Sequence, residues 1–145
     1  MTFTSTEQIK EYLLSCMKDA VIDAQEKVYK VLDEFLNKFY SSYDPSVYER
    51  MYYLLHSLVK SELISTGNGY KANVYFDYSS LHYTTGAKPS GLQVVTAAAS
   101  GGHGAEGLHI EQGSVGIWDD PMRILNSDMY KILKQSLIDA GIPIK

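Results

Sequence analysis

The sequence predicts an α+β fold in a single domain, residues 1–145. Three observations predict this class. A helical pattern of apolar residues fills the first forty positions, an alternating pattern around an Asn-Gly pair follows, and a second helical pattern closes the chain. Helices and an antiparallel sheet that occupy separate parts of a chain are typical of the α+β class.

The first expected element is a long helix at about residues 5–40. Ser5 and Gln8 have the S-x-x-Q spacing of a capping box, which satisfies two free amide groups where a helix begins. Behind them apolar residues recur at i, i+3, i+4 and i+7, with no glycine or proline before Tyr40. Such a helix is about 50 Å long, whereas a compact domain of this size is about 30 Å across. We therefore expect the helix to bend, or another molecule or segment to cover part of its apolar stripe.

A small antiparallel sheet is expected in the region of about residues 47–118. Residues 47–58 fit either an extended segment or a short helix. The sequence Gly67-Asn68-Gly69 predicts a tight hairpin, because Asn-Gly supplies the positive φ angles that such a turn needs. Along the second arm, residues 70–78, apolar side chains alternate with polar ones, as in a strand that is buried on one face.

A long flexible loop is expected at about residues 84–116, which contain eight of the eleven glycines. Within it, Val94-Val95-Thr96 is interpreted as a short strand, and residues 97–107 are interpreted as too small and flexible to pack in a core. Loops of this length are uncommon in compact domains unless they are functional or disordered. We therefore expect this loop to contact a partner.

The last expected element is a helix at about residues 127–140. Asp119-Asp120-Pro121 is interpreted as a turn before it, and Ser127 as its N-cap. The apolar positions that follow have helical spacing, and Gly141 then ends the helix.

Composition excludes several classes of protein. A formal net charge of -4 disfavours a nucleic-acid binder that neutralises phosphates, so no sequence-specific nucleic acid is expected as a partner. Cys16 is the single cysteine, which rules out an internal disulfide, and its place on the apolar stripe predicts a buried thiol. No stretch approaches twenty apolar residues, and no signal peptide begins the chain. The sequence therefore predicts a protein made in the cytoplasm that does not enter a membrane.

No group of residues predicts catalysis. His103 and His109 lie among glycines, where a solvated loop explains them better than a metal site. Asp119 and Asp120 precede a proline and are interpreted as turn residues rather than an acid pair. Residues 101–104 lack the Lys-Ser/Thr of a phosphate loop. We expect no enzyme activity, no cofactor and no metal; a hydrolase that uses His103, His109 and Asp119 is the enzymatic alternative.

Five tyrosines lie within fourteen residues, between Tyr40 and Tyr53. They form either a corner of the core with satisfied hydroxyl groups, or a contact surface in which rigid aromatic side chains and an arginine act as anchors. The interface candidates are Tyr43, Tyr48, Arg50, Tyr52, Tyr53, His103 and Trp118.

The segment Tyr43-Asp44-Pro45-Ser46-Val47-Tyr48-Glu49-Arg50 resembles the HK97-gp10-like group of phage proteins, which are head-tail joining or tail-completion components. The shared pattern is a long N-terminal helix, then Tyr-x-Pro-x-x-Tyr-x-Arg, then Leu-x-x-Ser, here within residues 54–58. The order of elements is similar over most of the chain, but the resemblance is specific only over residues 43–58. This motif is a structural signature, so it transfers no catalytic residue.

The resemblance implies a structural virion protein at the neck of a long-tailed bacteriophage. It further implies a homo-oligomeric ring, possibly a hexamer, through which DNA passes, with phage connector, tail-terminator or tail-tube proteins as neighbours. A closed ring needs two different faces on each subunit, and a helix too long for its domain supplies one of them. The alternative is a non-viral cytosolic adaptor whose long helix docks a partner helix.

Overall fold

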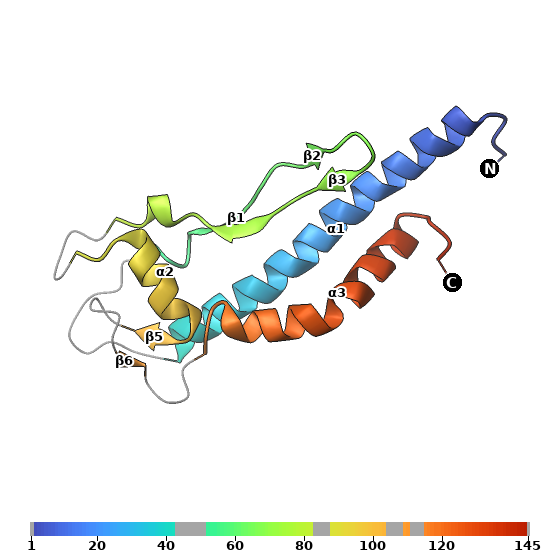
Figure 1. Ribbon diagram of the computed structural model, residues 1–145. Coiled ribbons are helices and arrows are strands. Elements are labelled where there is room, and N and C mark those ends of the chain that lie inside the picture. The colour runs from blue at the N-terminus through green and yellow to red at the C-terminus, as the bar shows by residue number, and fades with distance from the viewer. Residues whose placement is uncertain (1, 43–51, 83–87, 104–108, 111–114, 145) are drawn as a thin grey trace.

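The computed structural model describes residues 2–42, 52–82, 88–103, 109–110 and 115–144. Its spine is one long helix, α1, with a β-hairpin along one side and the C-terminal helix, α3, along another (Figure 1). A short helix, α2, lies near the C-terminal end of α1. The α+β class and the order of its main elements are therefore as the sequence predicts.

Helix α1 spans Thr6–Ser41 and confirms the predicted long helix. Its N-cap is Ser5, whose side chain accepts a hydrogen bond from the Gln8 amide at 3.2 Å. The second half of the expected capping box is displaced by one residue, because the Gln8 side chain accepts from the Thr4 amide at 2.8 Å. With 36 residues, the helix is about 54 Å long.

The hairpin consists of two short ladders in one long excursion of the chain. Strand β1 (Leu58–Lys60) pairs antiparallel with β4 (Val74–Phe76), and β2 (Ile64–Ser65) pairs with β3 (Tyr70–Lys71). Between the ladders Glu62 and Leu63 lie opposite Ala72 alone, which is the geometry of a β-bulge.

The expected hairpin and its alternating second arm are confirmed, but the turn differs in detail. Positive φ occurs at Gly67, at 85°, rather than at the Asn-Gly pair. The turn is closed by a hydrogen bond from the Thr66 amide to the Gly69 carbonyl at 2.9 Å. A four-residue turn replaces the two-residue turn that Asn-Gly predicts.

The expected loop at 84–116 contains regular structure. Helix α2 spans Gly91–Ala99, so the strand expected at Val94-Val95-Thr96 was wrong. Ser90 and Gln93 form a complete capping box, and an alanine run with high helix propensity follows. Ala98 is 2% exposed in the core, so this segment does pack against the rest of the protein.

Two further pieces of this region are described. Strand β5 (Gly102–His103) pairs antiparallel with β6 (His109–Ile110). After them, the amides of Ile117 and Trp118 donate to carbonyl groups at the end of α2. These contacts attach α2 to the chain segment that enters the last helix.

Helix α3 spans Asp119–Asp139 and begins eight residues earlier than expected. The segment Asp119-Asp120-Pro121 is its first turn and not a separate turn, since a proline there costs no hydrogen bond and carboxylates favour a helix N-terminus. Ser127 lies inside the helix, where its hydroxyl donates to the Ile124 carbonyl. Gly141, at φ 95°, ends the helix as predicted, with the Ile142 amide donating to the Leu137 carbonyl.

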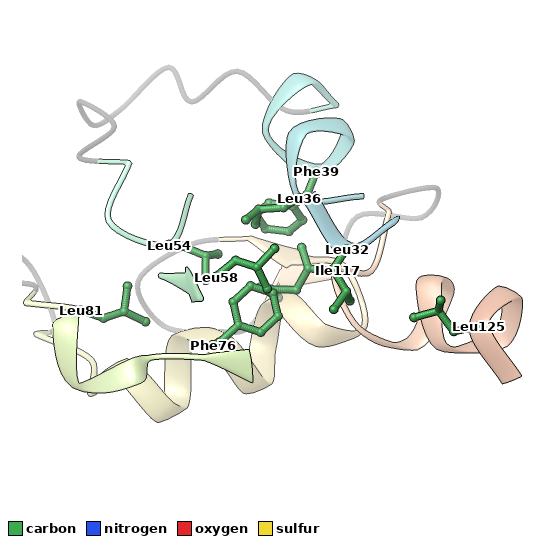
Figure 2. Packing of buried hydrophobic residues seen from close by; sticks show 10 residues of the cluster. Leu32, Leu36, Phe39, Leu54, Leu58, Phe76, Leu81, Ile117 and Leu125 are labelled. Atoms are coloured by element: carbon green, nitrogen blue, oxygen red, sulfur yellow. The ribbon is translucent and has the colours of Figure 1, made fainter. Parts of the chain in front are cut away.

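The main core lies at the C-terminal half of α1 (Figure 2). It joins side chains from α1, the hairpin, α2 and the start of α3, as follows: Leu32, Leu36, Phe39, Leu54, Leu58, Phe76, Leu81, Ala98, Ile117 and Leu125. Toward the N-terminus the buried residues of α1 become small, namely Cys16, Ala20 and Ala24. Cys16 is buried as predicted. The apolar stripe of α1 thus has a thick core at one end and a thin one toward the other.

Candidate interaction surface

An aromatic surface lies at the C-terminal end of α1. We define it by Tyr40, Tyr52 and Tyr53. The rings of Tyr40 and Tyr52 are stacked with centroids 5.4 Å apart, and Tyr52 and Tyr53 are 45% and 38% exposed. The next residue but one, Leu54, is buried in the core. Aromatic side chains therefore pass from the core to the surface at this place, as the contact-surface interpretation of the tyrosines requires.

Tyr52 has a backbone φ of 54°, in the left-handed region that side chains rarely adopt. For a bulky residue this conformation costs about 1–2 kcal/mol. Strained residues of this kind concentrate at binding and catalytic sites. The Tyr40 ring and the core contacts of the following residues hold Tyr52 in place with its ring partly exposed.

The other interface candidates have different positions. Tyr43, Tyr48 and Arg50 lie outside the described residues. Trp118 precedes the first turn of α3, 38% exposed, with its ring 6.3 Å from the Phe76 ring in an edge-on arrangement. It continues the core toward the surface on the side of α3.

The histidines of the hydrolase alternative lie in the β5–β6 ladder, where His103 is directly opposite His109. Asp119 is the first residue of α3 and is exposed. Within the described residues, no group of three or more histidine, cysteine, aspartate or glutamate side chains could hold a metal ion.

A second hydrophobic surface lies at the other end of α1. The first turns of α1 extend past the ends of both the hairpin and α3 (Figure 1). Tyr12 marks the end of α3, because its hydroxyl donates to the Gly141 carbonyl at 3.1 Å, and Met17 marks the hairpin turn through its contact with Gly69. Ile9 and Leu13 in this extension are 42% and 40% exposed.

These residues line a shallow apolar groove of about 310 Å³. We call it the overhang groove; its lining is Thr6, Ile9, Lys10, Leu13, Leu14, Met17 and Asn68. The sequence predicts that part of the stripe needs a cover, but it does not predict which half. The comparison that decides this is between the 36 residues of α1 and the 21 of α3, and the early start of α3 was missed.

A polar cluster joins α1 to α3 between the two surfaces. The Asp23 carboxylate accepts from Lys27 Nζ at 2.5 Å and from the Ser136 hydroxyl at 2.6 Å. Hydrogen bonding from Lys27, and then from Ser136, lowers the pKa of Asp23. The hydrogen bond to Asp23 raises the pKa of Lys27, so this lysine stays charged and is unsuited to act as a base. The cluster is a structural contact that fixes the register of the two helices.

The described helices include none that is long and apolar enough to cross a membrane. Fold and surfaces together define a small α+β protein in which hydrophobic side chains are exposed at both ends of a long helix. The chain belongs to the YomN family, whose model matches residues 5–140. No curated protein and no solved structure matches the chain. The matching family is thus YomN, and the resemblance to the HK97-gp10-like group stays a prediction.

Proposed function

We propose that this protein is a structural component of a phage particle, which joins the head connector to the tail as part of an oligomeric ring. Membership of the YomN family supports a phage-related role, because YomN is a prophage-region protein of Bacillus. The motif at residues 43–58, which resembles neck proteins, supports the more specific role. The role is proposed as a non-catalytic one, carried out in the virion after synthesis in the host cytoplasm.

The observation that carries the proposal is the separation of two unlike hydrophobic surfaces along α1. The aromatic surface lies at one end of a helix about 54 Å long, and the aliphatic overhang groove lies at the other. A ring subunit meets its neighbours through two different faces, and a joining protein needs a further surface for the next component. Tyrosines with one buried and one exposed side suit such contacts.

In this proposal the partners are further copies of the chain and the adjoining connector, tail-terminator or tail-tube proteins. The net charge of -4 keeps free subunits soluble and prevents tight binding to DNA that passes through the ring.

The test is a double variant, Tyr52→Ser with Tyr53→Ser, introduced into a phage or inducible prophage that carries this gene. We expect heads and tails that are both complete but not joined, as seen by electron microscopy, and a large loss of infectious particles. The control is Tyr78→Ser, which changes a tyrosine that is 55% exposed outside the aromatic surface. Normal joining in the double variant would contradict the proposal.

A second candidate, the adaptor that docks a partner helix, is favoured by the overhang groove alone, since amphipathic helices bind in grooves lined by aliphatic side chains. The adaptor predicts a monomer that binds one partner, whereas the ring predicts self-association. The hydrolase alternative is tested by replacing His103, His109 and Asp119 together, which we expect to leave particle assembly unchanged.

A further inference from the structure

The overhang groove continues the packing surface that α1 already uses for α3. Cys16, Ala20 and Ala24 of the same apolar stripe are buried along the part of α1 that α3 accompanies. Past Gly141 the stripe continues through Leu13 and Ile9, but α3 has ended. The groove therefore presents the apolar spacing of a helix-binding surface without the helix that covers the rest of it.

Helix α3 carries a matching surface on the side that faces away from α1. Tyr130 is the most exposed of the large hydrophobic residues at 72%, and Leu133 is 41% exposed. With Asn126 and Leu137, they recur at spacings of four, three and four residues, which places them on one stripe of the helix. We call these four residues the outer stripe of α3.

The charges beside the two surfaces are complementary. Glu7 and Glu11 outnumber Lys10 on the first turns of α1. Beside the outer stripe, Arg123 pairs with Asp120 and Lys131 with Asp128, which leaves the charge of Lys134 in surplus. Among the described residues no ion pair includes Glu7, Glu11 or Lys134.

We propose that the overhang groove of one copy packs against the outer stripe of α3 in a second copy of this chain. Each α3 then lies between its own α1 and the α1 of a neighbour. The two surfaces are different, so the contact is heterologous and repeats from copy to copy until a ring closes. This deepens the proposed function, on which the closure into a ring rests.

The contact is tested with purified protein by sedimentation velocity. Leu13→Asp blocks the groove, and Leu133→Asp blocks the outer stripe; both leucines are about 40% exposed, so the fold tolerates the change. We expect the wild type to form assemblies larger than the 16.2 kDa chain, and each variant to be monomeric. Leu92→Asp, at a leucine of α2 that is 56% exposed, is the matched control and should assemble like the wild type.

The decisive sample is an equimolar mixture of Leu13→Asp and Leu133→Asp. Each variant retains one intact surface, and the two intact surfaces are complementary, so the mixture should form a dimer and nothing larger. A mixture that stays monomeric, a monomeric wild type, or a Leu133→Asp variant that still assembles would each overturn the proposal. The last result would indicate a symmetric contact between two grooves.

The register is tested by charge exchange. Glu7→Lys should weaken association about two- to fivefold, as expected for an exposed ion pair, and Lys134→Glu in the same chain should restore it. Absence of restoration would overturn the proposed pairing of these helices. None of these measurements uses phage particles, so their failure is distinct from a failure of the head-tail joining role.

Discussion

Tyr52 combines a left-handed backbone, a stacked ring and partial exposure, with a φ of 54° and its centroid 5.4 Å from that of Tyr40. Glycine adopts this backbone at no steric cost, whereas alanine retains the strain and loses the ring contact. We expect Tyr52→Gly to be more stable than Tyr52→Ala by about 1 kcal/mol. Urea unfolding of the two variants measures the difference, and equal midpoints would show that the position is not strained.

Asp23 is expected to make the stability of the α1–α3 contact depend on pH. Its pKa is lowered below the ordinary value of 3.8 by hydrogen bonds from Lys27 and Ser136, so the folded state holds the proton less tightly than the unfolded state. The stabilisation is therefore present above pH 3.8 and is lost as the pH falls through the lower pKa of the folded state. The side chain is 42% exposed, so solvent screens the effect.

We expect Asp23→Asn to lower the free energy of unfolding by about 0.5–1 kcal/mol at pH 7. The difference from the wild type should shrink as the pH falls below 3.8. Glu34→Gln is the control, because Glu34 contacts Lys38 at 3.9 Å on the surface and should have a smaller effect. A difference that persists at low pH would assign the effect to the changed amide rather than to the charge.

At the scale of elements, the parts of the fold with strong periodicity could be predicted from the sequence. Helix α1 has eight turns of continuous apolar pattern, and the hairpin has both alternation and turn residues. Helix α2 was missed because Val94 and Val95 favour strands, and because the glycines on either side suggest a loop. The signal that identifies it is Ser90 with Gln93, the same S-x-x-Q spacing that marked the start of α1.

The position of α2 depends on a close approach at its first residue. A side chain at Gly91 would bring its Cβ atom within 1.9 Å of the Tyr78 carbonyl oxygen, which belongs to the 3₁₀ helix η1 (Tyr78–Ser80). We expect Gly91→Ala to separate α2 from η1 and to cost about 1–3 kcal/mol of stability. Thr96→Ala, on the exposed side of the same helix, is the control, and should be neutral or slightly stabilising because alanine favours helices. Thermal unfolding of both variants decides the matter.

At the scale of the whole molecule, the surfaces were predictable in kind but not in place. Twelve tyrosines and a clustered segment predict an aromatic contact surface, and Tyr52 and Tyr53 are exposed. The groove at the opposite end depends on where α3 ends relative to α1, which is a property of tertiary packing and not of local pattern. Ile9 and Leu13 have the same spacing as the buried Ala20 and Ala24, so the sequence cannot distinguish covered from exposed parts of the stripe.

The two surfaces should separate functionally, because they lie at opposite ends of α1. Leu13→Asp should abolish self-association of the purified protein and also the joining of heads and tails, since a ring precedes joining in the proposed function. Tyr52→Ser with Tyr53→Ser should abolish joining but leave self-association as in the wild type. Sedimentation velocity measures the first property, and electron microscopy of lysates measures the second. A tyrosine variant that no longer self-associates would show that the aromatic surface belongs to the contact between copies, and the ring would then need a different surface for its neighbours in the particle.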